Sequence, residues 1–114
     1  MNASTHIVEI EESNAQQLLI EESMTRPVVV DFWADWCGPC NVMKPQFHEL
    51  ADQFSSSDIR FGDYRLDANQ SNSIASREKV VGLPTYRIYR AGSAVDTMIG
   101  AGDLASFLKK HVKD

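Results

Sequence analysis

Residues 28–40 read Val28-Val29-Val30-Asp31-Phe32-Trp33-Ala34-Asp35-Trp36-Cys37-Gly38-Pro39-Cys40, and this stretch decides the fold. Its first six residues are mostly β-branched or aromatic, which predicts a strand that is covered on both faces. A helical pattern begins at Cys37 and runs to about Phe54, with Pro39 suited to the first turn. The stretch is therefore a strand that passes through a short turn into a helix, and the turn carries a Cys-x-x-Cys pair.

Cys37 and Cys40 are the only cysteines of the chain. Between a strand and a helix, such a pair is typical of a two-electron redox site that closes as a disulfide and opens as a dithiol. We expect Cys37 at the helix N-terminus, where free N–H groups and the helix dipole stabilise a thiolate, and hence as the exposed nucleophile. Cys40, one turn further along, is the expected buried resolving thiol. Gly38 lets the backbone pass closely, and Pro39 stiffens the turn.

A zinc site is the alternative use of the cysteine pair. It needs two further ligands, and the chain has no second Cys-x-x-Cys. The histidines, His6, His48 and His111, are scattered along the sequence. The pattern therefore favours thiol chemistry, and we expect no metal site.

The rest of the chain predicts alternating strands and helices. Strands are expected at residues 6–10, 28–33, 59–66, 85–90 and 95–99, and helices at residues 13–24, 37–54, 71–77 and from 103 onward. The elements of residues 28–66 form a right-handed parallel crossover, and residues 85–99 form an antiparallel hairpin that turns at Ala91-Gly92. The expectation is one α/β domain over residues 1–114, with a mixed sheet between helices.

The first predicted helix has a recognisable start and an apolar side. Ser13 is placed to cap it, and Gln16, three residues later, completes a capping box. Leu18, Leu19 and Met24 supply the apolar side that faces the core.

Composition limits the partners and the location that we expect. The formal net charge of −5 disfavours nucleic acids and anionic membranes, because both attract basic surfaces. The first residues lack the basic and apolar segments of a secretory signal, and the acidic residues that follow disfavour a transit peptide. No apolar run approaches the length of a membrane span. We expect a monomer in the reducing cytoplasm, with no nucleic-acid or membrane partner.

Residues 28–40, together with three later motifs, resemble the thioredoxin family. Gly82-Leu83-Pro84-Thr85, Gly92 and Gly100-Ala101 follow in that family's order and approximate spacing, and the likeness covers essentially the whole chain. The resemblance implies the thioredoxin fold, with a mixed sheet of about five strands flanked by about four helices. The Gly-Pro between the cysteines is similar to that of reducing members, so the resemblance implies a protein-disulfide reductase and electron carrier.

The resemblance also implies roles for residues around the cysteines. Asp31 matches the family's buried aspartate, which handles the proton of the resolving thiol; from the residues alone, a strand-end position bonded to loop amides stays open. Pro84 matches a cis-proline turn whose preceding backbone binds an extended substrate. The implied docking surface consists of Trp36, Gly82, Leu83, Pro84, Gly100 and Ala101, which without the cysteines would be a core aromatic and ordinary turn residues.

No bound cofactor is expected beyond the redox-active Cys37–Cys40 disulfide. The resemblance implies that electrons come from NADPH through a thioredoxin reductase, and that the substrates are proteins with disulfides. Two other functions stay open: a disulfide donor or isomerase, which requires a more oxidising pair, and a binding subunit in which the thiols are incidental.

The chain departs from the family pattern close to Asp31. Asp63 stands where bacterial members often carry a lysine, and we expect the loss of that lysine to raise the proton affinity of Asp31 and Cys40. Arg65, two residues later on the same face of the strand, is the candidate to compensate. Asn41 stands where a lysine is common, which removes a positive charge near the thiolate.

Overall fold

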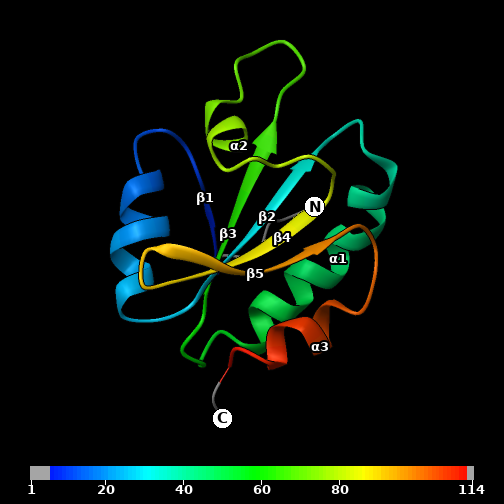
Figure 1. Ribbon diagram of the computed structural model, residues 1–114. Helices are drawn as coiled ribbons and strands as arrows, with labels where there is room; N and C mark the ends of the chain where they lie inside the picture. The colour runs from blue at the N-terminus through cyan, green and yellow to red at the C-terminus, as the bar shows by residue number, and fades with distance from the viewer. Residues whose placement is uncertain (1–5, 113–114) are drawn as a thin grey trace.

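The computed structural model describes residues 6–112, which form a five-stranded sheet with helices on its two faces (Figure 1). The strands are β1 (Ile7–Glu9), β2 (Val28–Ala34), β3 (Arg60–Leu66), β4 (Thr85–Arg90) and β5 (Ser93–Ile99). Their order across the sheet is β1-β3-β2-β4-β5. β3 pairs in parallel with both β1 and β2, whereas β4 pairs antiparallel with β2 and β5. The predicted mixed sheet of five strands is confirmed.

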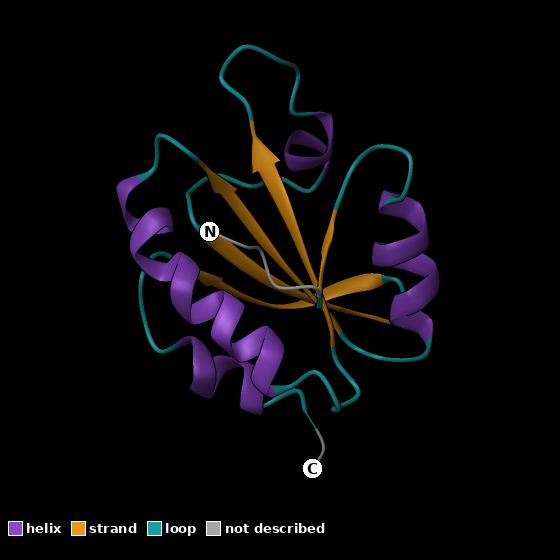
Figure 2. Cartoon of the chain, turned by 180° about the vertical axis from the view of Figure 1, so that it is seen from behind, coloured by secondary structure: helices purple, strands orange, loops and turns teal. Residues whose placement is uncertain are grey.

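Helical segments cover both faces of the sheet (Figure 2). α1 (Gly38–Gln53) and α3 (Leu104–Lys109) pack on one face. The consecutive segments η1 (Gln17–Glu21) and η2 (Glu22–Met24) pack on the other face with α2 (Ser73–Arg77). All four predicted helices are present, the first as a π-helical segment followed by a 3₁₀ turn. Within residues 6–112, no helix combines the length and apolar character needed to cross a bilayer.

β2 forms the centre of the core, and all of its residues are buried. Successive side chains of a strand point to opposite faces, so β2 contributes to two hydrophobic clusters. Val29 packs with α1 and α3, whereas Val28, Val30 and Phe32 pack with η1 and α2. A strand that is covered on both faces needs no polar alternation, which explains the apolar run. Asp31 is the exception within this run.

The β4–β5 hairpin turns at Ala91-Gly92, as predicted. Both turn residues have positive φ, 53° and 82°, the combination that suits a two-residue turn between right-twisted strands. Ser23 of η2 binds this turn: its carbonyl accepts a hydrogen bond from the Ala91 N–H at 2.7 Å, and its hydroxyl accepts one from the Gly92 N–H at 2.9 Å. The first helical segment is thereby joined to the hairpin.

The start of the first helical segment differs from the predicted capping box. Asn14 makes the side-chain contacts there instead of Ser13: its Oδ1 accepts from the Glu11 N–H at 2.8 Å, and its Nδ2 donates to the Glu9 carbonyl at 2.9 Å. Met24, predicted on the apolar side, is 63% exposed. The π-helical turn changes the angular spacing of side chains, so the ordinary helical period fails at Met24.

Candidate active site

The two cysteines lie where β2 passes into α1 (Figure 1). Cys37 is the N-cap of α1, and its Sγ accepts a hydrogen bond from the Cys40 N–H at 3.2 Å. The two residues form a disulfide, with their Cα atoms 5.3 Å apart. The sulfur of Cys37 therefore lies at the positive end of a long helix, where a thiolate is stabilised. Within residues 6–112, no group of three or more metal-ligating side chains comes together.

The exposure of Cys37 differs from the prediction. In this disulfide form only 8% of Cys37 is exposed, compared with 3% of Cys40. Both cysteines belong to a small cluster with Trp33 and Ala34, against which Leu83 packs. The burial of Cys40 is confirmed, but Cys37 is also largely covered, because residues distant in sequence pack around the turn.

Asp31 is buried in the middle of β2, with β3 on one side and β4 on the other. Only 5% of Asp31 is exposed, and its Oδ1 has no hydrogen-bond partner among the described residues. The alternative of a strand-end carboxylate bonded to loop amides is therefore wrong. The pKa of Asp31 is raised to about 8: burial raises it most, the Asp63 carboxylate also raises it, and Lys44 lowers it. At neutral pH the carboxyl is therefore protonated in most molecules and ionised in a minor fraction.

Asp63 is linked to the site through Trp33. It is the register partner of Asp31 on the parallel strand β3, and its Oδ2 accepts a hydrogen bond from the Trp33 Nε1–H at 3.1 Å. On the ring itself, the Nζ of Lys44 lies 3.6 Å from the Trp33 centroid, a cation–π contact. Burial raises the pKa of Asp63 as well, and the hydrogen bond from Trp33 opposes this effect.

Lys44 is a residue that the sequence reasoning missed. It lies on α1 one helical turn after Cys40, so the i,i+4 spacing was the available signal. Sequence patterns do not reveal that a lysine at this position turns back over an indole ring on β2. The contact depends on how α1 crosses the sheet.

The predicted compensation by Arg65 is wrong. The Arg65 guanidinium pairs with the exposed Asp35 carboxylate at 2.8 Å. The alternation of β3 does place Arg65 on the same side as Asp63, but Asp35 follows directly after β2 and lies within its reach. Asn41 also fixes this loop, because its Nδ2 donates to the Asp35 carbonyl at 3.0 Å. The cation that acts on Asp31 is Lys44.

The loop before β4 lies next to the end of β5. The Leu83-Pro84 peptide is cis, as the resemblance implied. The Pro84 carbonyl accepts a hydrogen bond from the Gly100 N–H at 2.8 Å, and the Gly82 carbonyl accepts one from the Thr85 hydroxyl at 2.6 Å. Gly100 has a φ of 87°, which glycine adopts without strain. The structure therefore brings Gly82, Pro84 and Gly100 together, and Leu83 packs against the cysteine cluster.

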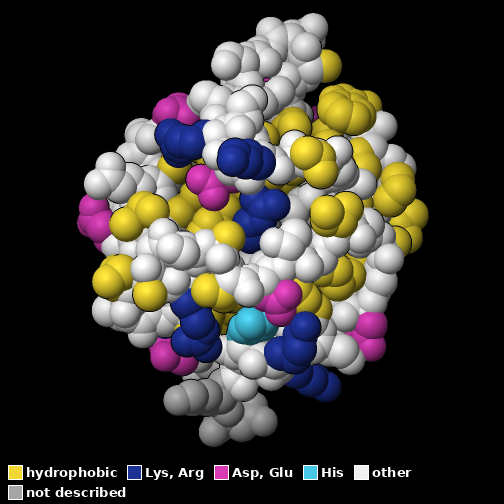
Figure 3. Space-filling view, in the orientation of Figure 1, with side chains coloured by type: hydrophobic (Ala, Val, Ile, Leu, Met, Phe, Trp, Pro, Cys, Tyr) yellow, Lys and Arg dark blue, Asp and Glu magenta, His cyan; other side chains and the backbone are white. Residues whose placement is uncertain are grey.

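The predicted docking residues differ in exposure. Trp36 is 64% exposed, and Ala101 is exposed too, whereas Pro84 is buried. Ile99, which the sequence reasoning missed, is 56% exposed, and its side chain lies against Gly82. Hydrophobic side chains also gather on the surface at the upper right of Figure 3, at the end of the molecule where β2 passes into α1 in Figure 1.

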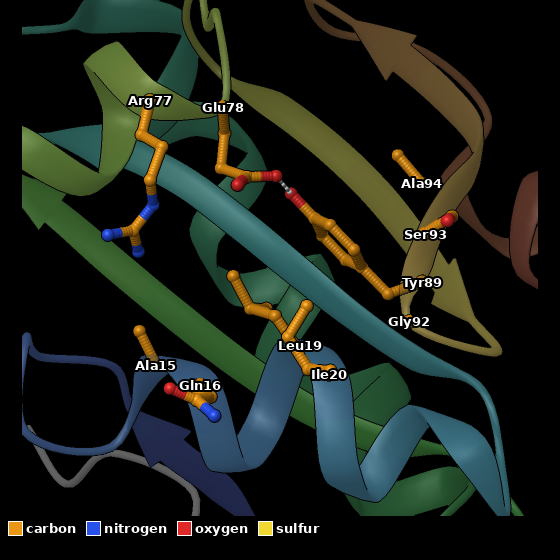
Figure 4. Close-up of a pocket in the computed structure, with 10 residues that line it drawn as sticks. All are labelled: Ala15, Gln16, Leu19, Ile20, Arg77, Glu78, Tyr89, Gly92, Ser93 and Ala94. Carbon is orange, nitrogen blue, oxygen red and sulfur yellow. Dashed lines mark hydrogen bonds between the residues drawn. The ribbon is translucent and has the colours of Figure 1, made fainter.

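A hollow of about 400 Å³ lies on the sheet face opposite α1, between η1 and the β4–β5 hairpin (Figure 4). At its edge the Tyr89 hydroxyl donates a hydrogen bond to Glu78 Oε1 at 2.6 Å. The other lining residues are Ala15, Gln16, Leu19, Ile20, Arg77, Gly92, Ser93 and Ala94. None of the predicted site residues lines this hollow, so it is separate from the site around the cysteines.

Comparison with known proteins identifies the family. The family model described as Thioredoxin matches residues 6–113. The chain is similar to the thioredoxin of Pyropia yezoensis, with 35% identity over 109 residues that cover 93% of this chain and 97% of the relative. It is also similar to thioredoxin 1 of Synechococcus elongatus, with 35% identity over 106 residues that cover 90% and 94%.

Solved structures give the same result for the fold. The crystal structure of Malassezia sympodialis thioredoxin matches with a TM-score of 0.81 and 25% identity, covering 97% of this chain and 95% of that chain. Thioredoxin NaTrxh from Nicotiana alata matches with a TM-score of 0.80 and 26% identity, covering 99% and 98%. The predicted thioredoxin fold is thereby confirmed. With its Cys-Gly-Pro-Cys disulfide at the start of α1, the chain belongs to the thioredoxin family of protein-disulfide oxidoreductases.

Proposed function

We propose that this protein reduces the disulfides of other proteins through Cys37 and Cys40, and that it carries electrons to them from a reductase. The observation that supports this most is the Cys37–Cys40 disulfide at the N-cap of α1. A disulfide that closes a loop this short adds little to stability, so its value is chemical. Its position lets the helix support the thiolate that appears when the disulfide is reduced.

The reaction starts from the dithiol form. The Cys37 thiolate attacks one sulfur of the target disulfide, so that a bond from Cys37 to the target forms while the target's own S–S bond breaks. The second target sulfur leaves as a thiolate and takes up a proton from solvent. The product is a mixed disulfide between this protein and its target.

Cys40 completes the reaction. In the molecules in which Asp31 is ionised, Cys40 gives its proton to the Asp31 carboxylate and attacks the Cys37 sulfur, so that the Cys37–Cys40 bond forms and the target leaves as its second thiolate. Two electrons have then passed from the dithiol to the target. Asp31 suits this role because its pKa, about 8, lies near the value of about 8.5 that is usual for a thiol.

The substrate is proposed to dock beside the disulfide as an extended segment. Trp36 offers an exposed aromatic surface, and the loop with the cis Leu83-Pro84 peptide borders the cysteine cluster. Gly82, Gly100 and Ala101 add surface with little or no side-chain bulk, so that a peptide backbone has room to approach. The docking surface is therefore shallow and partly apolar.

Electrons are proposed to come from NADPH through a thioredoxin reductase, with no cofactor bound to this chain. We also propose that the protein acts as a monomer in the cytoplasm, where a reductase keeps the pair reduced. Several similar proteins are named as chloroplastic, including a thioredoxin M-type of Brassica napus at 36% identity over 100 residues. Localising the protein with an antibody in its own cells distinguishes the cytoplasm from an organelle.

The test of this function is the reduction potential of the Cys37–Cys40 pair. The protein is equilibrated in dithiothreitol and glutathione buffers, and Trp36 and Trp33 fluorescence reports the state of the disulfide. We expect a value more negative than the cytosolic glutathione potential, together with reduction of a disulfide-bonded test protein. A value well above that potential contradicts the proposal, because the pair then donates its disulfide instead of reducing others.

A further inference from the structure

Two carboxyl groups lie side by side on neighbouring strands near the disulfide. Asp31 on β2 and Asp63 on β3 are register partners of a parallel pair, so their side chains point to the same sheet face. Asp31 is almost fully buried and its Oδ1 has no partner among the described residues, whereas Asp63 is half-buried and bonded to Trp33. Two neighbouring carboxylates oppose each other's ionisation.

Lys44 supplies a positive charge to this pair. It is half-buried on α1, the helix that packs on the same sheet face. Its Nζ lies over the ring of Trp33, 3.6 Å from the centroid, while the Nε1–H at the edge of that ring donates to Asp63. The Trp33 ring thus contacts the Lys44 ammonium with its face and the Asp63 carboxylate with its edge.

The other charged groups around the pair do not take this role. Arg65 is bonded to Asp35 at the surface. The pKa of His48 is lowered by burial and by Lys44, so His48 is mainly neutral at pH 7 and above. From β4, Tyr86 faces Asp31 as a neutral phenol, because burial raises the pKa of Tyr86.

Glu9 on β1 completes the surroundings of the pair. Glu9 is the register partner of Asp63 on the strand beyond β3, and its negative charge raises the pKa of Asp63. Glu9, His48 and Lys44 border one hollow of about 320 Å³ with Trp33 and Asp63. Solvent ions and protons therefore have access to the outer side of this cluster.

We propose that Lys44, held over Trp33, is the positioning residue whose charge offsets Asp63 and lowers the pH at which Asp31 ionises. This inference rests on the proposed function only for its consequence, namely the transfer of the Cys40 proton to Asp31. Without the Lys44 ammonium, the negative charge of Asp63 is not compensated, and Asp31 holds its proton to higher pH. At neutral pH a smaller fraction of Asp31 is then ionised, so Asp31 is a poorer acceptor for the Cys40 proton.

The experiment measures the ionisation of Asp31 directly, by carbon-13 NMR of its side-chain carboxyl in the oxidised protein. Four proteins are titrated: the natural chain, Lys44→Met, Lys44→Arg and Arg65→Met. Lys44→Met is expected to raise the midpoint of Asp31 by about half a pH unit or more, because the nearby positive charge is lost. Lys44→Arg, which keeps the charge, is expected to restore most of the natural midpoint.

Arg65→Met is the matched control, because it removes the same charge from the border of the same hollow. Its effect on the Asp31 midpoint is expected to be much smaller than that of Lys44→Met. Equal shifts in the two variants overturn the proposal, as does a Lys44→Met midpoint that equals the natural one. Thermal unfolding of each variant checks that the fold is retained.

Asp63→Asn supplies a second, opposite test. Removing this carboxylate is expected to lower the Asp31 midpoint, and adding Lys44→Met is expected to move it back up. A midpoint that stays in place in Asp63→Asn contradicts the offset that we propose.

The proposed function is tested separately, in the same variants, by the pH dependence of Cys40 alkylation in the reduced protein. If the Asp31 midpoint moves but the Cys40 profile does not, Lys44 tunes Asp31 and the role of Asp31 as proton acceptor is wrong. Failure of the Lys44 proposal and failure of the proposed function are therefore distinguishable, because the NMR titration of Asp31 does not depend on turnover.

Discussion

The two faces of β2 are equally buried but differ in their chemistry. On the η1 and α2 face, Val28, Val30 and Phe32 pack into a cluster of buried hydrophobic side chains. On the α1 face, the strand carries Asp31 and Trp33; Trp33 belongs to the cysteine cluster, and Lys44 acts on both side chains. The same strand therefore stabilises the fold on one side and places a buried acid on the other.

The difference shows where this fold accepts an energetic cost. A buried carboxyl oxygen without a hydrogen-bond partner is unfavourable, and the protein reduces that cost because Asp31 is mainly protonated below about pH 8. The apolar face of β2 offsets what remains, because its side chains are completely buried. Substitutions on the α1 face should consequently change the thiol chemistry, whereas substitutions on the η1 and α2 face should change the free energy of unfolding.

The largest expected effect is on the α1 face, at the resolving thiol. Cys40→Ser should abolish turnover and leave the target bound to Cys37 as a mixed disulfide, because no second thiolate is present to release it. The adduct is measured by mass spectrometry under non-reducing conditions. Cys37→Ser is the matched variant, and it should neither turn over nor form the adduct. Normal turnover of Cys40→Ser would contradict the proposed roles.

On the opposite face, Phe32→Ala should affect stability and leave the chemistry intact. Phe32 is fully buried and its ring centroid lies 5.9 Å from that of Tyr64, so its loss should lower the free energy of unfolding by about 3–5 kcal/mol. Urea denaturation measures this change. The reduction potential of the folded variant should equal that of the natural protein, and Phe32→Leu serves if Phe32→Ala does not fold. A large change in potential would mean that the two faces are coupled.

A smaller effect, and one that depends on pH, is expected at Asp31. The folded protein keeps the Asp31 proton up to about pH 8, whereas the unfolded chain releases it near 3.8. Between these values the folded state binds more protons, so stability falls as pH rises and becomes level above about pH 8. Asp31→Asn removes this dependence, and its advantage over the natural protein should grow across that range to the order of a few kcal/mol.

Urea denaturation of the oxidised proteins at a series of pH values measures this advantage. The other titratable groups are shared by the two proteins, so the difference between the two curves isolates Asp31. A difference that stays constant from pH 4 to pH 8 would mean that Asp31 ionises normally in the folded state.

Much of the fold was predictable because its signals are local. The apolar run of β2, the Cys-x-x-Cys turn and the two-residue turn at Ala91-Gly92 are each contained in a few consecutive residues. The first helical segment was less predictable, since its π-helical turn interrupts the ordinary period and exposes Met24. The choice of Asn14 instead of Ser13 at its start depends on contacts with the end of β1.

The candidate site was predictable at the residues with a chemical signature. Cysteines, a lone aspartate in an apolar strand and a proline turn are visible in the sequence. The structure places the aspartate in the middle of β2, and the cysteines follow the end of that strand, with Leu83 of the proline turn packed against them. Lys44 and Arg65 have no such signature, because both are ordinary charged side chains on amphipathic elements. The prediction assigned the compensating charge to Arg65 and missed Lys44, which was its main error.

The sequence by itself determined the type of chemistry and the order of the elements, since both depend on residues that are neighbours along the chain. Two thiols at this spacing, between a buried strand and a helix, already specify a redox site. Only the tertiary structure decided how far Cys37 is covered and which cation faces Asp31. Both depend on packing between segments that are distant in sequence: Leu83 against the cysteine cluster, and Lys44 of α1 over Trp33 of β2.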